Sequence, residues 1–87
     1  MMYPFLTLPD DTEIIHSEMK EDGRVKVYIE TPDEKDGFHH AVCCLPDYEW
    51  TEISGYSEAE MRKFKTLVKN NAQLIMTFSQ HGGILNA

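Results

Sequence analysis

The feature that most constrains the fold is a long amphipathic pattern in the last third of the chain. The segment Ser57-Glu58-Ala59-Glu60 has the form of a capping box, in which the serine hydroxyl and the Glu60 carboxylate satisfy free amides at a helix start. Apolar residues then recur at intervals of three and four, and Gly82-Gly83 supplies a stop. This stripe predicts a helix that packs on a sheet, or one that also builds a helix-mediated dimer. It comprises Met61, Phe64, Leu67, Val68, Leu74, Ile75 and Phe78, with Asn71 either setting register in a helix pair or lying at the stripe's margin.

The segments 12–20 and 24–31 flank Glu21-Asp22-Gly23 and predict a β-hairpin. A three-residue loop with Gly23 in the left-handed conformation separates apolar from polar pairs better than a two-residue turn does. In that register Glu18 faces Lys26 and His16 faces Tyr28 on the polar side. The residues predicted to face the helix are Ile15, Ser17, Met19, Val25, Val27 and Ile29.

A third antiparallel strand is predicted over residues 38–45, after the polar turn at 32–37, and Pro46 ends it. Its run Ala-Val-Cys-Cys-Leu is apolar without alternation, which predicts that both faces are covered. The second cover is either the N-terminal arm, residues 3–8, or another subunit. The arm itself is expected to be a short edge strand or an extended cover. Residues 47–56 are interpreted as an irregular link.

These patterns predict one α+β domain over residues 1–87, in which a three-stranded antiparallel meander, with a possible short N-terminal edge strand, packs on one long C-terminal helix. With 87 residues the domain is small enough to gain stability from a second copy, so a homodimer is expected. No apolar run is long enough to cross a membrane and no secretion signal is evident, so we expect a cytoplasmic protein with reduced cysteines.

Negative charge is concentrated in the first two thirds of the chain. Residues 1–57 carry 13 acidic and four basic side chains, whereas residues 58–87 carry two acidic and four basic ones. This balance argues against direct nucleic-acid binding and favours a basic protein partner, bound by a small acidic module that acts as an antitoxin or an inhibitor would. The residues predicted to contact the partner are Asp33, Glu34, Asp36, Asp47 and Glu49, with Tyr48 and Trp50 as aromatic anchors. Trp50 is alternatively a cover for one end of the core.

The adjacent pairs His39-His40 and Cys43-Cys44 raise the question of a metal or catalytic site. At about 3.3 Å per residue, a histidine and a cysteine on one face of this strand lie about 13 Å apart, too far to share a zinc ion. The cysteines lack a local basic neighbour, and no phosphate-binding glycine loop is present, so neither an enzyme nor a cofactor is predicted. The alternative function is metal or small-ligand binding by a sheet row formed from His16, Tyr28, His39 or His40.

The predicted hairpin, the third strand, Gly55 and the capping box at 57–60 together are similar in element order to HicB-type antitoxins. That resemblance covers residues 12–80 and implies a meander followed by a helix. The chain lacks that family's glycine-rich early strands and its C-terminal DNA-binding unit, so no repressor role is implied. The chain also resembles small bacterial proteins of the conserved-hypothetical type, for which the resemblance implies no function.

Overall fold

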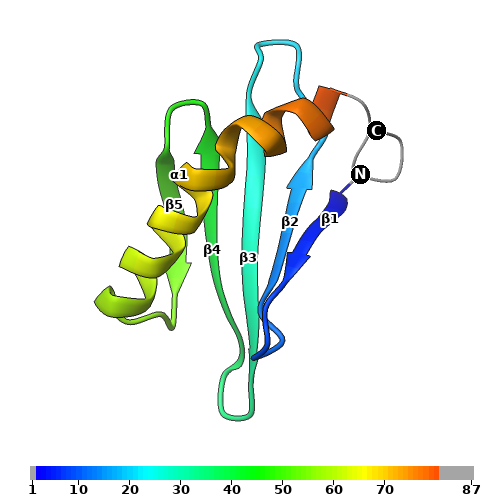
Figure 1. Ribbon diagram of the computed structural model, residues 1–87. Coiled ribbons are helices and arrows are strands. Elements are labelled where there is room, and N and C mark those ends of the chain that lie inside the picture. Colours follow the sequence, from blue (N-terminus) through cyan, green and yellow to red (C-terminus); the bar gives the residue numbers. More distant parts are fainter. Residues whose placement is uncertain (1, 81–87) are drawn as a thin grey trace.

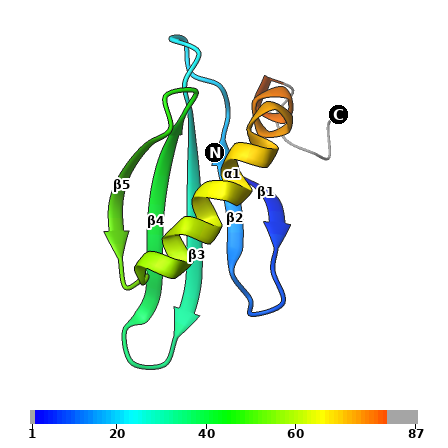
Figure 2. The same ribbon diagram turned by 60° about the vertical axis from the view of Figure 1, so that its left-hand side comes forward.

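The computed structural model describes residues 2–80, which form one antiparallel sheet and one helix (Figure 1). The sheet has five strands in sequence order, and α1 crosses one of its faces diagonally, from β5 towards β1 (Figure 2). The α+β class is confirmed, but the three-stranded meander is wrong. The elements are β1 (Met2–Thr7), β2 (Glu13–Ser17), β3 (Val25–Asp33), β4 (Gly37–Leu45), β5 (Glu49–Ser54) and α1 (Glu58–Gln80).

The two additional strands lie at the edges of the sheet. The N-terminal arm forms β1, which pairs with β2, so of its two predicted placements it has that of an edge strand. Strand β5 pairs with β4 where an irregular link was expected. Its alternation is hidden because the pairing shifts register and because Glu52 has a positive φ of 52°. Two glutamates in six residues also weaken the strand signal.

The β2–β3 hairpin has the predicted loop but a different register. The Lys20 amide donates to the Arg24 carbonyl at 2.9 Å, and Gly23 has φ of +82°. Beyond the loop the pairing slips by one residue, so that Ile14 lies opposite Ile29 and His16 opposite Val27. The Ser17 hydroxyl accepts a 3.0 Å hydrogen bond from the Lys26 amide and so satisfies a donor at the slip. Ile14 and His16 therefore face the helix, and Ile15 does not.

We call the sheet face that α1 covers the inner face and the opposite one the outer face. Val25 and Val27 on β3 are fully buried on the inner face, as predicted. The capping box is also confirmed, since the Glu60 amide donates to the Ser57 hydroxyl at 3.1 Å and the Ser57 amide donates to the Glu60 carboxylate at 2.9 Å. The core cluster comprises Ile14, Val25, Val27, Ile29, Ala41, Cys43, Leu45, Met61, Phe64, Val68 and Ile75.

The helix stripe is narrower than predicted. Leu74 is 46% exposed and does not join the core, because it lies on the side of α1 that faces away from the sheet. Asn71 is half-buried at the margin and donates to the Leu67 carbonyl at 2.8 Å. The predicted stop at Gly82-Gly83 lies outside the described residues. Within residues 2–80, no helix is both long and apolar enough to span a membrane.

The residues of strand β4 point alternately to the two faces despite its apolar sequence, although Val42 on the outer face is also buried, with 3% of its surface exposed. Cys43 and Leu45 are fully buried on the inner face, while Phe38, His40 and Cys44 lie on the outer face with partial or full exposure. Since β1 sits beside β2, the arm does not cover β4, contrary to one of the two predictions for this strand. No element between residues 2 and 80 covers the outer face (Figure 1).

Candidate functional site

The outer face carries an acidic groove where the β1–β2 and β3–β4 turns lie side by side. It has a volume of about 440 Å³ and combines carboxylates with apolar side chains. Phe38, which is 59% exposed, provides a large aromatic surface in it. We call this site the outer-face groove. It is lined by Thr7, Asp11, Glu13, Glu30, Pro32 and Phe38.

Three carboxylates in the outer-face groove lack countercharges. Glu13 on β2 lies directly opposite Glu30 on β3, a position in which like charges repel across a sheet. Asp11 adds a third negative charge from the β1–β2 turn, where its φ is +68°. Within residues 2–80, none of the three forms an ion pair or a side-chain hydrogen bond. The groove therefore has an unbalanced negative potential beside an exposed aromatic ring.

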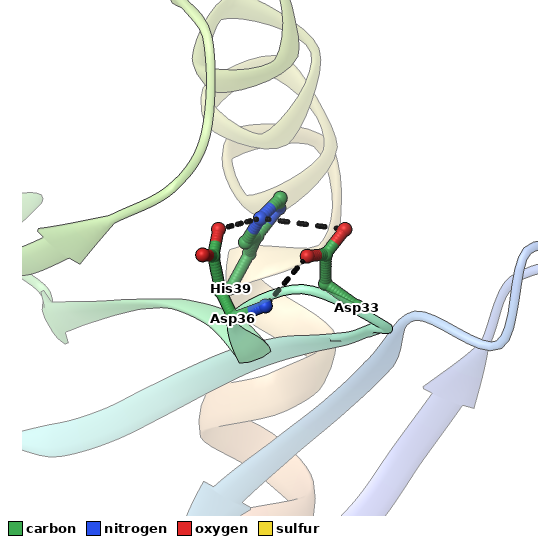
Figure 3. A group of neighbouring side chains, drawn as sticks. All are labelled: Asp33, Asp36 and His39. Atoms are coloured by element: carbon green, nitrogen blue, oxygen red, sulfur yellow. Dashed lines mark hydrogen bonds and ion pairs between the residues drawn. The ribbon is translucent and has the colours of Figure 1, made fainter.

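A second cluster, formed by Asp33, Asp36 and His39, lies at the β3–β4 hairpin on the inner side (Figure 3). Its possible ligand atoms, one from each side chain, all lie within 4.8 Å of one another. The His39 Nε2 atom is 3.2 Å from the nearer Asp36 oxygen and 3.7 Å from Asp33 Oδ1. We call these three residues the hairpin cluster. Among residues 2–80 it is the one group with the composition and spacing of a metal site.

The structure divides the predicted partner-binding residues into two groups at opposite ends of β4. Asp33, Glu34 and Asp36 lie at the β3–β4 turn, and the segment 47–50 lies at the turn before β5 and in its first residues. The two groups therefore do not form one continuous face (Figure 1).

The second of these groups is partly neutralised. Asp47 forms an ion pair with Arg24. Tyr48 and Trp50 line a groove of about 460 Å³ together with Lys65 and Lys69 of α1, so the aromatic residues lie beside basic side chains. Trp50 also packs against the core cluster and is partly buried, which agrees with its alternative role as a core cover. This end of the sheet does not present the purely acidic surface that the sequence indicated.

The predicted histidine and tyrosine row is not formed. His16 is fully buried on the inner face, where its ring packs beside those of Tyr3 and Phe5, whereas Tyr28 and His40 lie on the outer face. The His16 Nδ1 atom lies 2.8 Å from the Ser17 carbonyl oxygen. The one-residue slip of β2 separates His16 from Tyr28, because neighbouring positions on a strand point to opposite faces. His39 alone of the three candidate histidines joins a cluster of possible metal ligands.

The cysteines have the packing expected of structural thiols. Cys43 is fully buried, and burial together with the neighbouring Cys44 raises its thiol pKa to about 12. A thiol with so high a pKa is a poor nucleophile at neutral pH. Cys44 is half-buried on the outer face, and both cysteines are free.

Several residues of the two sites were not singled out from the sequence. Asp11, Glu13 and Glu30 contribute to the groove, and Phe38 was assigned only to a strand. Glu13 and Glu30 lie at nearly equal distances along the chain from the β2–β3 loop, which indicates that they could pair. That signal identifies the pair only if the register of the hairpin is known.

The comparisons find no matching family model, curated protein or solved structure. The five-stranded sheet also differs from the meander on which the resemblance to HicB-type antitoxins rested.

Proposed function

We propose that the protein is a binding module that docks a basic segment of a partner protein in the outer-face groove. The observation that carries this proposal is the direct opposition of Glu13 and Glu30, with no countercharge among the described residues. Such a pair costs folding free energy, which a bound cation would recover. The groove therefore gains more from a basic ligand than a paired acidic surface would.

The apolar part of the groove favours a side chain with an apolar stem. Phe38 and Pro32 lie opposite each other on β4 and β3, next to the carboxylates. Lysine and arginine cover apolar surface with their methylene groups while their charged ends remain in a polar environment. An arginine can also stack on an aromatic ring and bind a carboxylate through two hydrogen bonds. An arginine-rich segment thus matches both components of the groove.

A direct test measures binding of a short oligo-arginine peptide by isothermal titration, with the neutral citrulline analogue as the control ligand. The expected result is binding of the arginine peptide alone, with an affinity that falls as salt is added. The variant Glu13→Gln/Glu30→Gln should weaken binding at least about tenfold, the loss expected for about 1.4 kcal/mol of interaction. Asp47→Asn/Glu49→Gln changes the net charge equally and should have a much smaller effect.

Two results would overturn the proposal. Equal weakening by both double variants would show that only the total charge matters. Loss of binding in Asp47→Asn/Glu49→Gln alone would place the site at the β4–β5 turn. The variant Phe38→Ala distinguishes groove binding from diffuse attraction, because it leaves the charge unchanged and should weaken binding only if the arginine packs on the ring.

A further inference from the structure

We propose that the hairpin cluster binds one divalent transition-metal ion through Asp33, Asp36 and His39. These three side chains converge from the end of β3, the following turn and β4 (Figure 3). Zinc bonds to histidine nitrogen and carboxylate oxygen are about 2.0–2.2 Å long, so a shared ion would hold the ligand atoms roughly 3–3.5 Å apart. The observed separations of up to 4.8 Å require only small side-chain movements to reach that arrangement.

Asp33 is held in position by its own turn. Its Oδ2 atom accepts hydrogen bonds from the backbone amides of Lys35 at 3.0 Å and Asp36 at 2.9 Å. The other oxygen, Oδ1, is thereby directed towards His39. Because the turn fixes the carboxylate before any ligand arrives, binding a metal costs less side-chain entropy at this position.

His39 is held by contacts that come from a different part of the chain. Its ring packs against Gly55, where an added Cβ atom would lie only 2.2 Å from the His39 Cδ2 atom. The ring of Tyr56 meets it edge-on, with the centroids 5.7 Å apart, and the Tyr56 hydroxyl donates to the His39 carbonyl at 3.2 Å. These contacts restrain the imidazole while Nε2 points at both carboxylates.

A proton on His39 Nε2 can serve Asp36, at 3.2 Å, but leaves the Asp33 Oδ1 atom 3.7 Å away without a hydrogen bond to the ring. An imidazole nitrogen carries at most one proton, which can be directed at one carboxylate, whereas here two carboxylates approach the same Nε2 atom. A divalent ion offsets both negative charges and accepts all three ligands. The imidazole favours zinc over magnesium, because magnesium prefers oxygen ligands alone. Three protein ligands would leave further positions for water.

The decisive experiment titrates chelator-treated protein with zinc chloride and measures the heat of binding by isothermal calorimetry. The expected result is one binding site in the parent protein. His39→Gln and Asp36→Asn should each weaken binding at least about tenfold, since even the loss of a group that only supports a ligand costs about 10–100-fold. The matched controls are His40→Gln and Glu34→Gln, which remove the neighbouring histidine and the acidic residue between Asp33 and Asp36 without touching the cluster. Both should bind zinc like the parent protein.

A second measurement keeps the test valid if a variant is unstable. Manganese ions added to the labelled parent protein should broaden the amide signals of residues 33–39 and leave those of residues 21–24, at the opposite end of the sheet, unchanged. Absence of zinc binding in the parent, or equal loss in His40→Gln, would overturn the proposal. Glu13→Gln/Glu30→Gln should retain zinc binding, so failure of the groove proposal and failure of the metal proposal give different results.

Discussion

The two faces of the sheet are built from the same strands but differ in how far their side chains are covered and in whether their charges are compensated. On the inner face, side chains such as Val27 and Leu45 have no exposed surface, and α1 covers them. On the outer face, Glu13 and Glu30 repel each other and Phe38 is largely exposed, with no covering element in residues 2–80. Stability therefore comes mainly from the inner face. The outer face can carry unfavourable charge because its cost is small compared with the apolar burial on the other side.

The largest predicted contrast between the faces is at two adjacent isoleucines. Ile14 is 2% exposed in the core, whereas Ile15 is half-buried on the outer face beside Tyr28. Ile14→Ala should lower the free energy of unfolding by about 3 kcal/mol, because it removes buried methyl groups and leaves a cavity. Ile15→Ala should cost about 1 kcal/mol or less. Urea unfolding followed by Trp50 fluorescence measures both, and the reverse order would restore the register predicted from the sequence.

That register shows how far the sequence determines the fold. Alternation in β3 was sufficient to assign Val25, Val27 and Ile29 to the inner face, because those positions are apolar and their neighbours are polar or amphipathic. In β2, Ile14 and Ile15 are equally apolar, so the pattern fits two registers. In the structure the Ser17 hydroxyl accepts a hydrogen bond from the Lys26 amide. This bond gives the amide a partner where the pairing of β2 and β3 shifts by one residue. Side-chain hydrogen bonds of this kind have no periodic signal in a sequence.

Two glycines provide the next contrast. Gly37 and Gly55 have similar positive φ values of 84° and 90°, so alanine strains the backbone at both. An added Cβ atom meets nothing within 4 Å at Gly37 but collides with the His39 ring at Gly55. Gly55→Ala should therefore lower stability by about 1–2 kcal/mol more than Gly37→Ala, the usual range for overpacking. Thermal melts of the two variants compare these costs, and zinc titration should show the larger loss of affinity for Gly55→Ala, because only that substitution displaces the His39 ring. Equal melting temperatures for the two variants would mean that the His39 ring moves away from residue 55 at little cost in stability.

The pH dependence of stability should differ between Cys43 on the inner face and Cys44 on the outer face. Burial holds the pKa of Cys43 at about 12 in the folded protein, whereas an unfolded cysteine ionises near 8.5. Above about pH 9 the unfolded chain releases a proton that the folded chain retains, so stability falls as the pH rises. Cys43→Ala should remove about 2 kcal/mol of this fall near pH 10, because pH 10 lies about 1.5 units above the unfolded pKa and each unit corresponds to about 1.4 kcal/mol. Unfolding at several alkaline pH values measures the slope, with Cys44→Ala as the control. An unchanged slope in Cys43→Ala would contradict the assignment of Cys43 to the inner face.

The two candidate sites differ in how much of them the sequence could predict. Asp33 and Asp36 were selected for their charge and His39 as a possible ligand, yet their convergence depends on Gly55, about 16 residues further along the chain than His39. That contact exists only because β5 forms, and β5 was the strand the sequence did not reveal. The outer-face groove depends in the same way on the one-residue slip, which places Glu13 opposite Glu30. In both cases the residue types were visible, while their pairing required the sheet.

The smallest predicted effect concerns the glutamate pair itself. If Glu13 and Glu30 repel each other across the strands, Glu13→Gln and Glu30→Gln should each raise the free energy of unfolding by about 0.5 kcal/mol or less. The double variant should gain little beyond either single variant, because one substitution already removes the repulsion. A double-mutant cycle measured by urea unfolding at low salt isolates this coupling.

Added salt provides the control for that cycle, since screening weakens the repulsion between partly exposed charges. The coupling between Glu13 and Glu30 should shrink in high salt, whereas the Ile14→Ala effect should persist, because burial on the inner face does not depend on charge. Additive gains in the double variant, independent of salt, would mean that the two carboxylates do not interact. The outer-face groove would then lose the unfavourable charge pair on which the proposed binding of a basic segment depends.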